Sequence, residues 1–339
     1  MNAYDYSNSI GQTFTEQSNL TFYHTTMFIV HRFNNIFVFA IGLVLSLLLF
    51  YLIVRHTPQY LRSFSRLLFI CTLADLFVVV SHFLLQTRLR ISNGWYISQF
   101  TGPFSLLSLD KQKYAVGLQA ITGYTGIVLL STQYYYRYQV IVRRRAPTNI
   151  DVFSYFCVPV LLLTFIGISC YIAFTPIIDF HNTYWYREDT VPVLVISRIQ
   201  SPLFNFHSLS SGLILIGSYL ASMYIGHLTV NQLKAAELSK RTRSLHQQLS
   251  RSLILQSISP LISVIPITIL VVSILAGEEN SYFADYAILT VEWTPVLNML
   301  GTLCCIKPYY EYCLGKLYHL RRKDQTVQSI STAVFNVSK

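Results

Sequence analysis

Charged residues are scarce in this chain of 339 residues. They make up only 12% of it, whereas a soluble domain carries about 25%. This shortage argues against a cytosolic globular enzyme. The hydrophobic share of 53% argues against intrinsic disorder, which needs low hydrophobicity and high charge. A mean hydropathy of +0.44 indicates that a bilayer is the main solvent of the folded protein.

Sequence motifs for catalysis and metal binding are also missing. The chain has no phosphate-binding glycine loop, no Gly-x-Ser-x-Gly and no His-Glu-x-x-His. No pair among the six cysteines has zinc-ligand spacing supported by histidine, and none lies in a predicted outer loop. We therefore predict no enzyme activity, no cofactor, no metal site and no outer disulfide. Cys313 follows the last apolar block and is either a palmitoylation site or a plain free thiol.

The hydrophobic residues fall in seven blocks, each long enough to cross a bilayer. A hydrocarbon core of about 30 Å needs about 20 helical residues. Short connectors without repeats or Pro-rich linkers separate the blocks, so we predict one all-α, integral membrane bundle of seven transmembrane helices. The first block has no basic segment before it and no cleavage site after it, which favours a span over a signal peptide. The blocks are residues 33–54, 67–86, 114–136, 152–174, 203–226, 252–276 and 283–306.

Basic residues are distributed unequally over the two sides of this bundle. Of the 25 Lys and Arg residues, 18 lie on the side that holds the C-terminus. The positive-inside rule then predicts an extracellular segment at 1–32, a transmembrane domain at 33–306 in the plasma membrane and a cytoplasmic tail at 307–339. Asn19 begins a glycosylation sequon on the outer side, which is either used or a chance match. Because the basic residues lie in connectors rather than on one folded face, the predicted partner is the lipid bilayer and not nucleic acid.

Polar side chains within apolar spans are costly, so they are the first candidates for function. Five of the six candidates fall in the outer part of the predicted bundle, and a glutamate lies at the floor of the same zone. A few polar groups in a cavity between helices are typical of a small-molecule site. Each side chain could instead form a hydrogen bond between helices. The six predicted ligand-binding residues are His82, Gln86, Gln119, Asn205, His207 and Glu292.

A second set of residues points to a conformational switch at the cytoplasmic side. Asp75 lies in the second span, where it is either part of a switch or a structural hydrogen-bond partner between helices. Arg137 ends the third span, where it is either a switch or an ordinary membrane anchor. Pro260 and Pro295 interrupt the sixth and seventh spans, as hinges or as static kinks. The charged connector 227–251 offers a partner surface or only a solvated face. Its candidate coupling residues are Arg243 and His246.

Several short runs resemble one receptor family. They are Tyr51-Leu52-Ile53-Val54-Arg55-His56-Thr57-Pro58, Leu73-Ala74-Asp75-Leu76, Tyr136-Arg137-Tyr138, Ser239-Lys240-Arg241-Thr242-Arg243-Ser244-Leu245-His246-Gln247-Gln248-Leu249 and Lys307-Pro308-Tyr309. Together they resemble the nematode serpentine chemoreceptors, class delta, within the Str superfamily of seven-transmembrane G-protein-coupled receptors. The resemblance covers roughly residues 35–320. Phe104 departs from it, because many relatives carry cysteine there, and Ser46 stands where relatives often carry asparagine.

The resemblance implies a chemosensory receptor in the ciliary membrane of sensory neurons. An odorant or pheromone-like small molecule would bind in the outer cavity, span six would open at its cytoplasmic end, and a heterotrimeric G protein would bind near Arg137 and residues 227–251. The alternative is a ligand-gated ion channel of the odorant-receptor kind, which also has seven spans. That architecture puts the N-terminus inside, against the charge distribution. A transporter is a third option, but the chain shows no inverted repeat.

Overall fold

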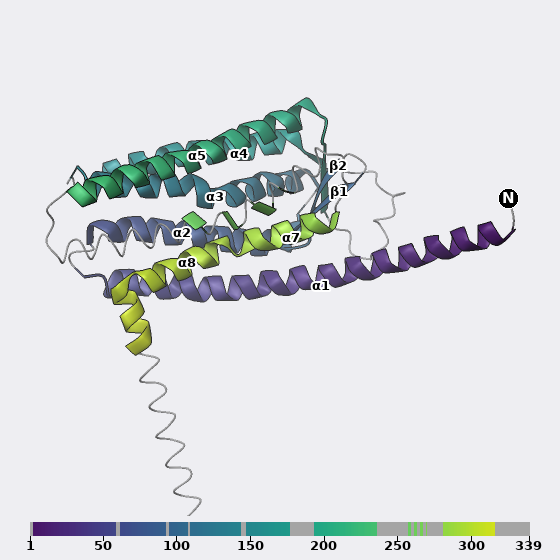
Figure 1. The fold of residues 1–339 in the computed structure, drawn as a ribbon, viewed down its shortest axis with the longest axis horizontal. Helices are drawn as coiled ribbons and strands as arrows, with labels where there is room; N and C mark the ends of the chain where they lie inside the picture. The colour runs from purple at the N-terminus through teal and green to yellow at the C-terminus, as the bar shows by residue number, and fades with distance from the viewer. Residues whose placement is uncertain are drawn as a thin grey trace, which may run out of the picture.

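The computed structural model describes most of the predicted transmembrane domain. Within the residues described below, six helices are long and apolar enough to cross a bilayer, and they overlap six of the seven predicted blocks. The remaining block, 252–276, lies mostly outside the described residues, and the positions described within it are helical. Figure 1 shows the long helices side by side, which confirms the predicted all-α membrane bundle. The described residues are 3–58, 62–92, 95–107, 109–143, 147–176, 193–235 and 281–315, with 257–258, 261–262, 265–266 and 269.

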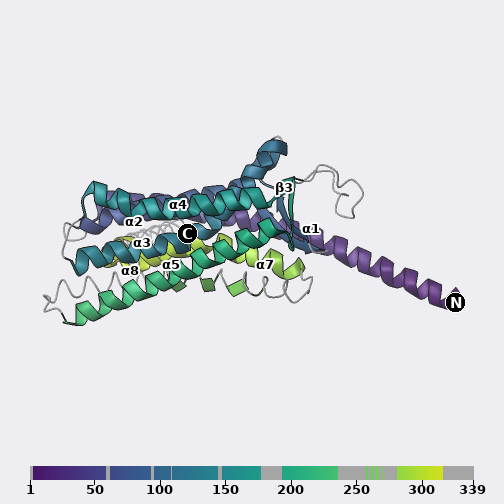
Figure 2. The ribbon, with the colours of Figure 1, turned by 90° about the horizontal axis from the view of Figure 1, so that it is seen from above.

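The helices differ in how far they extend beyond their apolar cores. The first continues well past the bundle toward the N-terminus, as both views show (Figures 1 and 2). Most of the predicted segment 1–32 is therefore a continuation of this helix. The helices are α1 (Ala3–Arg55), α2 (Arg62–Leu85), α3 (Leu109–Ile141), α4 (Asn149–Ala173), α5 (Pro202–Ala235), α7 (Ser281–Glu292) and α8 (Thr294–Cys305).

Local sequence signals set the ends of two helices. α4 begins with a capping box, in which the Thr148 hydroxyl accepts from the Asp151 amide and the Asp151 carboxylate accepts from the Thr148 amide. The seventh block is divided at Trp293, and Pro295 stands in the first turn of α8. Proline supplies no amide hydrogen and favours the first turn of a helix, which explains the position of the break. The predicted interruption at Pro295 is thus confirmed, whereas Pro260 lies outside the described residues.

α3 is the central helix and contacts α2, α4 and α5. Small residues allow its closest approach to α4. A methyl group placed on Gly117 would lie 3.1 Å from the carbonyl oxygen of Gly167, and one on Gly167 would lie 2.7 Å from the Ile121 side chain. Such small residues are typical of tightly packed membrane helices. Side chains on α3 therefore reach three neighbouring helices, which suits this helix to form the centre of a site.

A four-stranded antiparallel sheet covers one end of the bundle, which we call the sheet end. The sheet lies where α2 and α4 end and where α5 and α7 begin (Figure 1). Its order is β1-β2-β4-β3, and the 3₁₀ helix η2 (Pro103–Leu106) follows β2. The sequence predicts only loops here, so the sheet is an addition to the predicted bundle. The strands are β1 (Thr87–Ser92), β2 (Trp95–Phe100), β3 (Thr175–Pro176) and β4 (Val193–Arg198).

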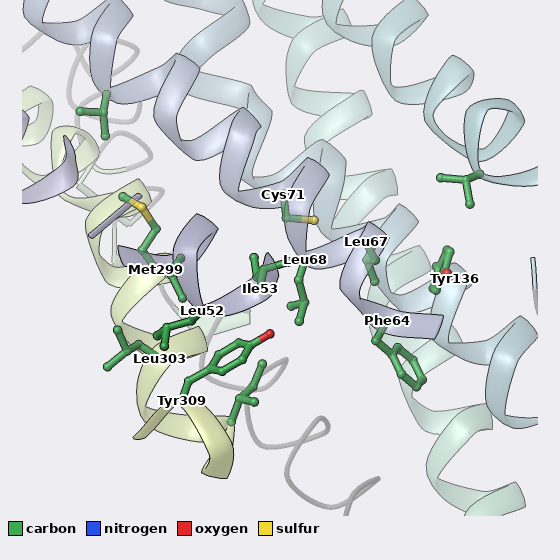
Figure 3. Close-up of a cluster of buried hydrophobic side chains, with 14 residues drawn as sticks. Leu52, Ile53, Phe64, Leu67, Leu68, Cys71, Tyr136, Met299, Leu303 and Tyr309 are labelled. Atoms are coloured by element: carbon green, nitrogen blue, oxygen red, sulfur yellow. The ribbon is translucent and has the colours of Figure 1, made fainter. Parts of the chain in front are cut away.

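The opposite end, which we call the basic end, contains the largest apolar cluster. Figure 3 shows Leu52, Leu68, Leu303 and Tyr309 in this cluster, contributed by α1, α2, α8 and the helical segment 307–315. The Tyr309 hydroxyl shares a hydrogen bond of 2.7 Å with the Thr57 hydroxyl. Burial raises the pKa of the Tyr309 phenol above its usual value, so this bond is made by a neutral side chain. The segment 307–315 is thereby attached to the end of α1.

Candidate functional site

Three aromatic rings close the bundle beneath the sheet. Tyr96 of β2, Phe174 at the end of α4 and Phe204 of α5 lie with ring centroids 5.4 to 6.0 Å apart. We call these three residues the aromatic lid. Their tilted and edge-on arrangement is the one that aromatic pairs prefer. Burial raises the pKa of the Tyr96 phenol, so the hydroxyl stays protonated. The lid lies where β2 meets the end of α4 and the beginning of α5.

A polar cluster lies about one helical turn deeper than the lid. His207 of α5 is 8% exposed, and its Nδ1 shares a hydrogen bond of 2.8 Å with the Ser169 hydroxyl of α4. The Ser211 hydroxyl lies 3.4 Å from the same nitrogen and also bonds Tyr124 of α3. We call His207, Ser169 and Ser211 the His207 cluster. Three helices thus contribute donors and acceptors to one buried position, as in small-molecule sites between helices.

Glu292, the deepest of the predicted ligand residues, bonds α1. The Asn34 amide donates to the Glu292 carboxylate, and the Trp293 indole nitrogen donates to the Asn34 carbonyl oxygen at 3.0 Å. Glu292 is only 3% exposed. The hydrogen bonds that the structure describes therefore link α1 to the break between α7 and α8. They fit the structural alternative for this residue, and its role in ligand binding stays a prediction.

The other predicted ligand residues occupy varied positions. Gln119 is half-buried on the central α3, and Asn205 is exposed on the first turn of α5. His82 is half-buried near the end of α2, and within the described residues its Nδ1 has no hydrogen-bond partner. Gln86 follows α2 with φ 45°, in the left-handed region, and its carbonyl oxygen accepts from the Thr101 amide and hydroxyl. Gln86 therefore shapes the turn into β1.

The structure does not gather these six side chains into one cavity. Among the described contacts, the single link between two of them is the backbone bond from the Gln86 amide to the His82 carbonyl oxygen, 2.8 Å long. None of the six lines the groove along α2 and α4 or the smaller hollow on α1. His207 is the predicted residue with the most complete polar surroundings. Gln119 lies on α3, the helix that contacts α2, α4 and α5.

At the basic end, polar groups connect three other helices. The Asn298 amide of α8 donates to the Asp75 carboxylate of α2 at 3.3 Å. Cys71, one turn from Asp75, lies close to Arg137 of α3. Arg137 is only 3% exposed, and Cys305 of α8 also lies near it. A plain membrane anchor would extend its guanidinium to the lipid headgroups. Burial of Arg137 between α2 and α8 instead supports the switch alternative.

The remaining predicted residues fall outside these clusters. Arg243, His246 and Pro260 lie outside the described residues. The backbone of Asn19 is part of α1, and its glycosylation stays a prediction.

Sequence reasoning missed the partners of the predicted residues. Ser211 follows His207 by four residues, so the two share a helix face, and this spacing could have identified it. Asn34 and Asn298 are polar residues within or beside apolar spans. Because such residues are energetically costly in a membrane, they could have been singled out in the sequence. Nothing in the sequence singles out Ser169 as a partner of His207, because a serine within an apolar helix commonly bonds the backbone of its own helix. It does this here too, with the Ile166 carbonyl oxygen at 2.9 Å.

The described helices form an apolar membrane bundle with one buried polar cluster near the sheet end and another at the basic end. The family model of the serpentine type 7TM GPCR chemoreceptor Srd matches residues 31–315, and the chain belongs to this family. The match confirms the resemblance to class delta serpentine chemoreceptors. Among curated proteins, none matches the chain. The chain is therefore a multi-pass membrane protein of a chemosensory receptor family, which is a family of receptors and not of enzymes.

Proposed function

We propose that this receptor binds a small environmental molecule at its sheet end and activates a heterotrimeric G protein at its basic end. The family match over residues 31–315 carries the proposal, because it covers both polar clusters. The proposed orientation puts the sheet outside and the C-terminus in the cytoplasm, in accord with the positive-inside rule. The proposed location is the plasma membrane of a sensory cilium.

The His207 cluster is the proposed centre of the ligand site. It joins α4 and α5 to the central α3 beneath the aromatic lid, and Gln119 lies about one turn from Tyr124 on α3. The residues around it are apolar or aromatic, including Phe100, Ala120 and Ile166. A ligand that suits such surroundings is mainly apolar, with one or two polar groups that bond the histidine and the serines. Glu292, His82 and Gln86 lie at the margin of the proposed site.

Activation is proposed to change the contacts of α3 with α2 and α8 at the basic end. Arg137 and the Asp75–Asn298 bond link these three helices. A ligand that binds one arrangement of the helices better than another shifts the population toward it. The G protein would then bind near Arg137 and residues 227–251. The break between α7 and α8 at Trp293 provides one place where the seventh span can bend.

Substitution of His207 tests the ligand site. Loss of one polar partner from a buried site costs about 1–3 kcal/mol, or roughly five- to a hundredfold in affinity. In cells that express the receptor and a G-protein reporter, His207→Phe should raise the half-maximal concentration of a screened odorant at least fivefold. The control is Leu209→Phe, an exposed position on the same helix, which should leave potency unchanged. Equal potency of wild type and His207→Phe at matched surface expression would show that His207 only joins α5 to α4.

A further inference from the structure

A wide groove opens on the side of the bundle, between α2 and α4. Its cavity volume is about 1270 Å³, which exceeds the usual 300–1,000 Å³ of a small-molecule pocket. α2 and α4 form its walls, and Ile121, Thr125 and Leu129 of α3 form its floor. None of the residues in the His207 cluster or at the Arg137 switch lines it. The groove is therefore separate from both parts of the proposed receptor mechanism.

The groove faces the position of the bilayer. Phe69, Leu73 and Phe77 on α2 and Phe153 and Val160 on α4 all line it, and each is at least 41% exposed. Exposed apolar side chains on membrane-spanning helices lie against lipid chains, because water does not fill the hydrocarbon region. A hollow at this position is therefore open to the acyl chains of the surrounding lipid.

The groove is lined by a charged side chain at one end. Along its length, the hydroxyls of Thr125 and Thr164 donate to carbonyl oxygens of their own helices, at 2.7 and 2.8 Å. At the basic end, Thr57, Ser65 and Arg66 line the groove. The Arg66 side chain is exposed, and it forms no ion pair with the described part of the chain. The groove is thus apolar over most of its length and cationic at its basic end.

We propose that this groove binds an anionic phospholipid, with one acyl chain along α3 and the phosphate at Arg66. The planar guanidinium offers several donors to phosphate oxygens, and its charge complements an anionic headgroup. Arg66 lies at the same end as Arg137, so the headgroup belongs to the cytoplasmic leaflet, where anionic lipids gather. This leaflet assignment rests on the orientation of the proposed function. The lipid would bridge α2 and α4 across the central helix.

Native mass spectrometry of the purified full-length protein tests this site directly. The detergent-solubilised protein is mixed with phosphatidylserine or with phosphatidylcholine of the same acyl chains. Wild type should retain phosphatidylserine preferentially. Because one basic side chain near an anionic surface changes binding about fivefold, Arg66→Gln should lower retention of phosphatidylserine by that factor and remove the preference. Arg66→Lys should restore most of the binding, which separates loss of charge from loss of folding.

A second variant tests the apolar part of the groove. Ala74→Phe fills part of the groove from α2 and should lower retention of both lipids. The matched controls are Arg143→Gln and Ala221→Phe, at exposed positions that do not line the groove, and neither should change retention. Equal retention of the two lipids by wild type, or retention unaffected by Arg66→Gln, would overturn the proposal. No odorant or G protein takes part in this experiment. A negative result would therefore not contradict the proposed function, and the lipid result can be interpreted even if the proposed function is wrong.

Discussion

Single polar side chains form hydrogen bonds between spans that are far apart in the sequence. Asn34 is bonded through both atoms of its amide, to Glu292 and to Trp293, more than 250 positions along the chain. His207 of α5 bonds Ser169 of α4 through one ring nitrogen, Nδ1. Hydrogen bonds between membrane helices contribute about 0.6 kcal/mol on average and up to about 1.7 kcal/mol. A polar side chain left without its partner in the spans costs more than the bond contributes.

Replacement of Glu292 distinguishes its structural role from a ligand-binding role. Glu292→Leu leaves the Asn34 amide without its acceptor, so the free energy of unfolding should fall by about 1–3 kcal/mol. Glu292→Gln keeps an acceptor oxygen in the same place, so its decrease in the free energy of unfolding should be less than half that of Glu292→Leu. The measurement is the thermal unfolding midpoint of the purified receptor, with Leu47→Ala, which removes an exposed side chain of α1, as the control. Unchanged stability of Glu292→Leu together with lower odorant potency would assign Glu292 to the ligand site.

The sequence identifies polar residues within spans but not their partners. His207 and Glu292 could be singled out because a polar group in an apolar span is costly. Their partners Ser169 and Asn34 depend on how each helix is rotated about its axis. Packing against neighbouring helices sets this rotation, and the rotation cannot be derived from a single sequence. Asn205 illustrates the same limit, because it lies near His207 in sequence but is exposed.

At the scale of elements, the spans are far more predictable than the sheet. A bilayer demands about 20 consecutive apolar residues, so each span is visible as a block. β1 alternates polar and apolar residues from Arg88 to Ile91, which is a signal for a strand, but β2 shows no such alternation. β2 pairs with β4, in which Arg198 lies opposite Trp95, about a hundred positions earlier. Pairing over such a separation cannot be read from local sequence.

Gly102 tests the junction between the sheet and the bundle. A methyl group at Gly102 would lie 2.3 Å from the Leu84 carbonyl oxygen, closer than any real contact, so the backbone would have to move. Gly102→Ala should therefore destabilise the receptor by at least 1 kcal/mol and loosen the sheet, because strain of this kind is costly. Faster hydrogen exchange in residues 95–100 would report the loosening.

The matched control for that variant is Gly217→Ala. Gly217 lies within α5 and has open space around it, so the methyl group is accommodated there. Since alanine favours a helix over glycine by about 1 kcal/mol, Gly217→Ala should leave stability unchanged or raise it. If Gly102→Ala behaved like Gly217→Ala, the close approach of Gly102 to the end of α2 would not exist in the protein.

For the whole molecule, the orientation in the membrane determines which polar cluster meets the odorant. The excess of basic residues on the side of the C-terminus predicts that this side is cytoplasmic. An epitope tag placed before residue 20 should be stained on intact cells. A tag placed after residue 325 should be stained only after permeabilisation. Staining in the reverse order would place the His207 cluster at the cytoplasmic face and would favour the ligand-gated channel.

In the proposed function, odorant binding at one end of this bundle activates a G protein at the other. The most direct test is odorant-stimulated binding of a GTP analogue to a heterotrimeric G protein, in membranes that contain the receptor. Wild type should accelerate nucleotide exchange, and Arg137→Ala should abolish the acceleration while odorant binding persists. Arg143→Gln, at an exposed position of the same end, should respond as wild type does. An odorant-evoked ion current without any nucleotide exchange would contradict the account.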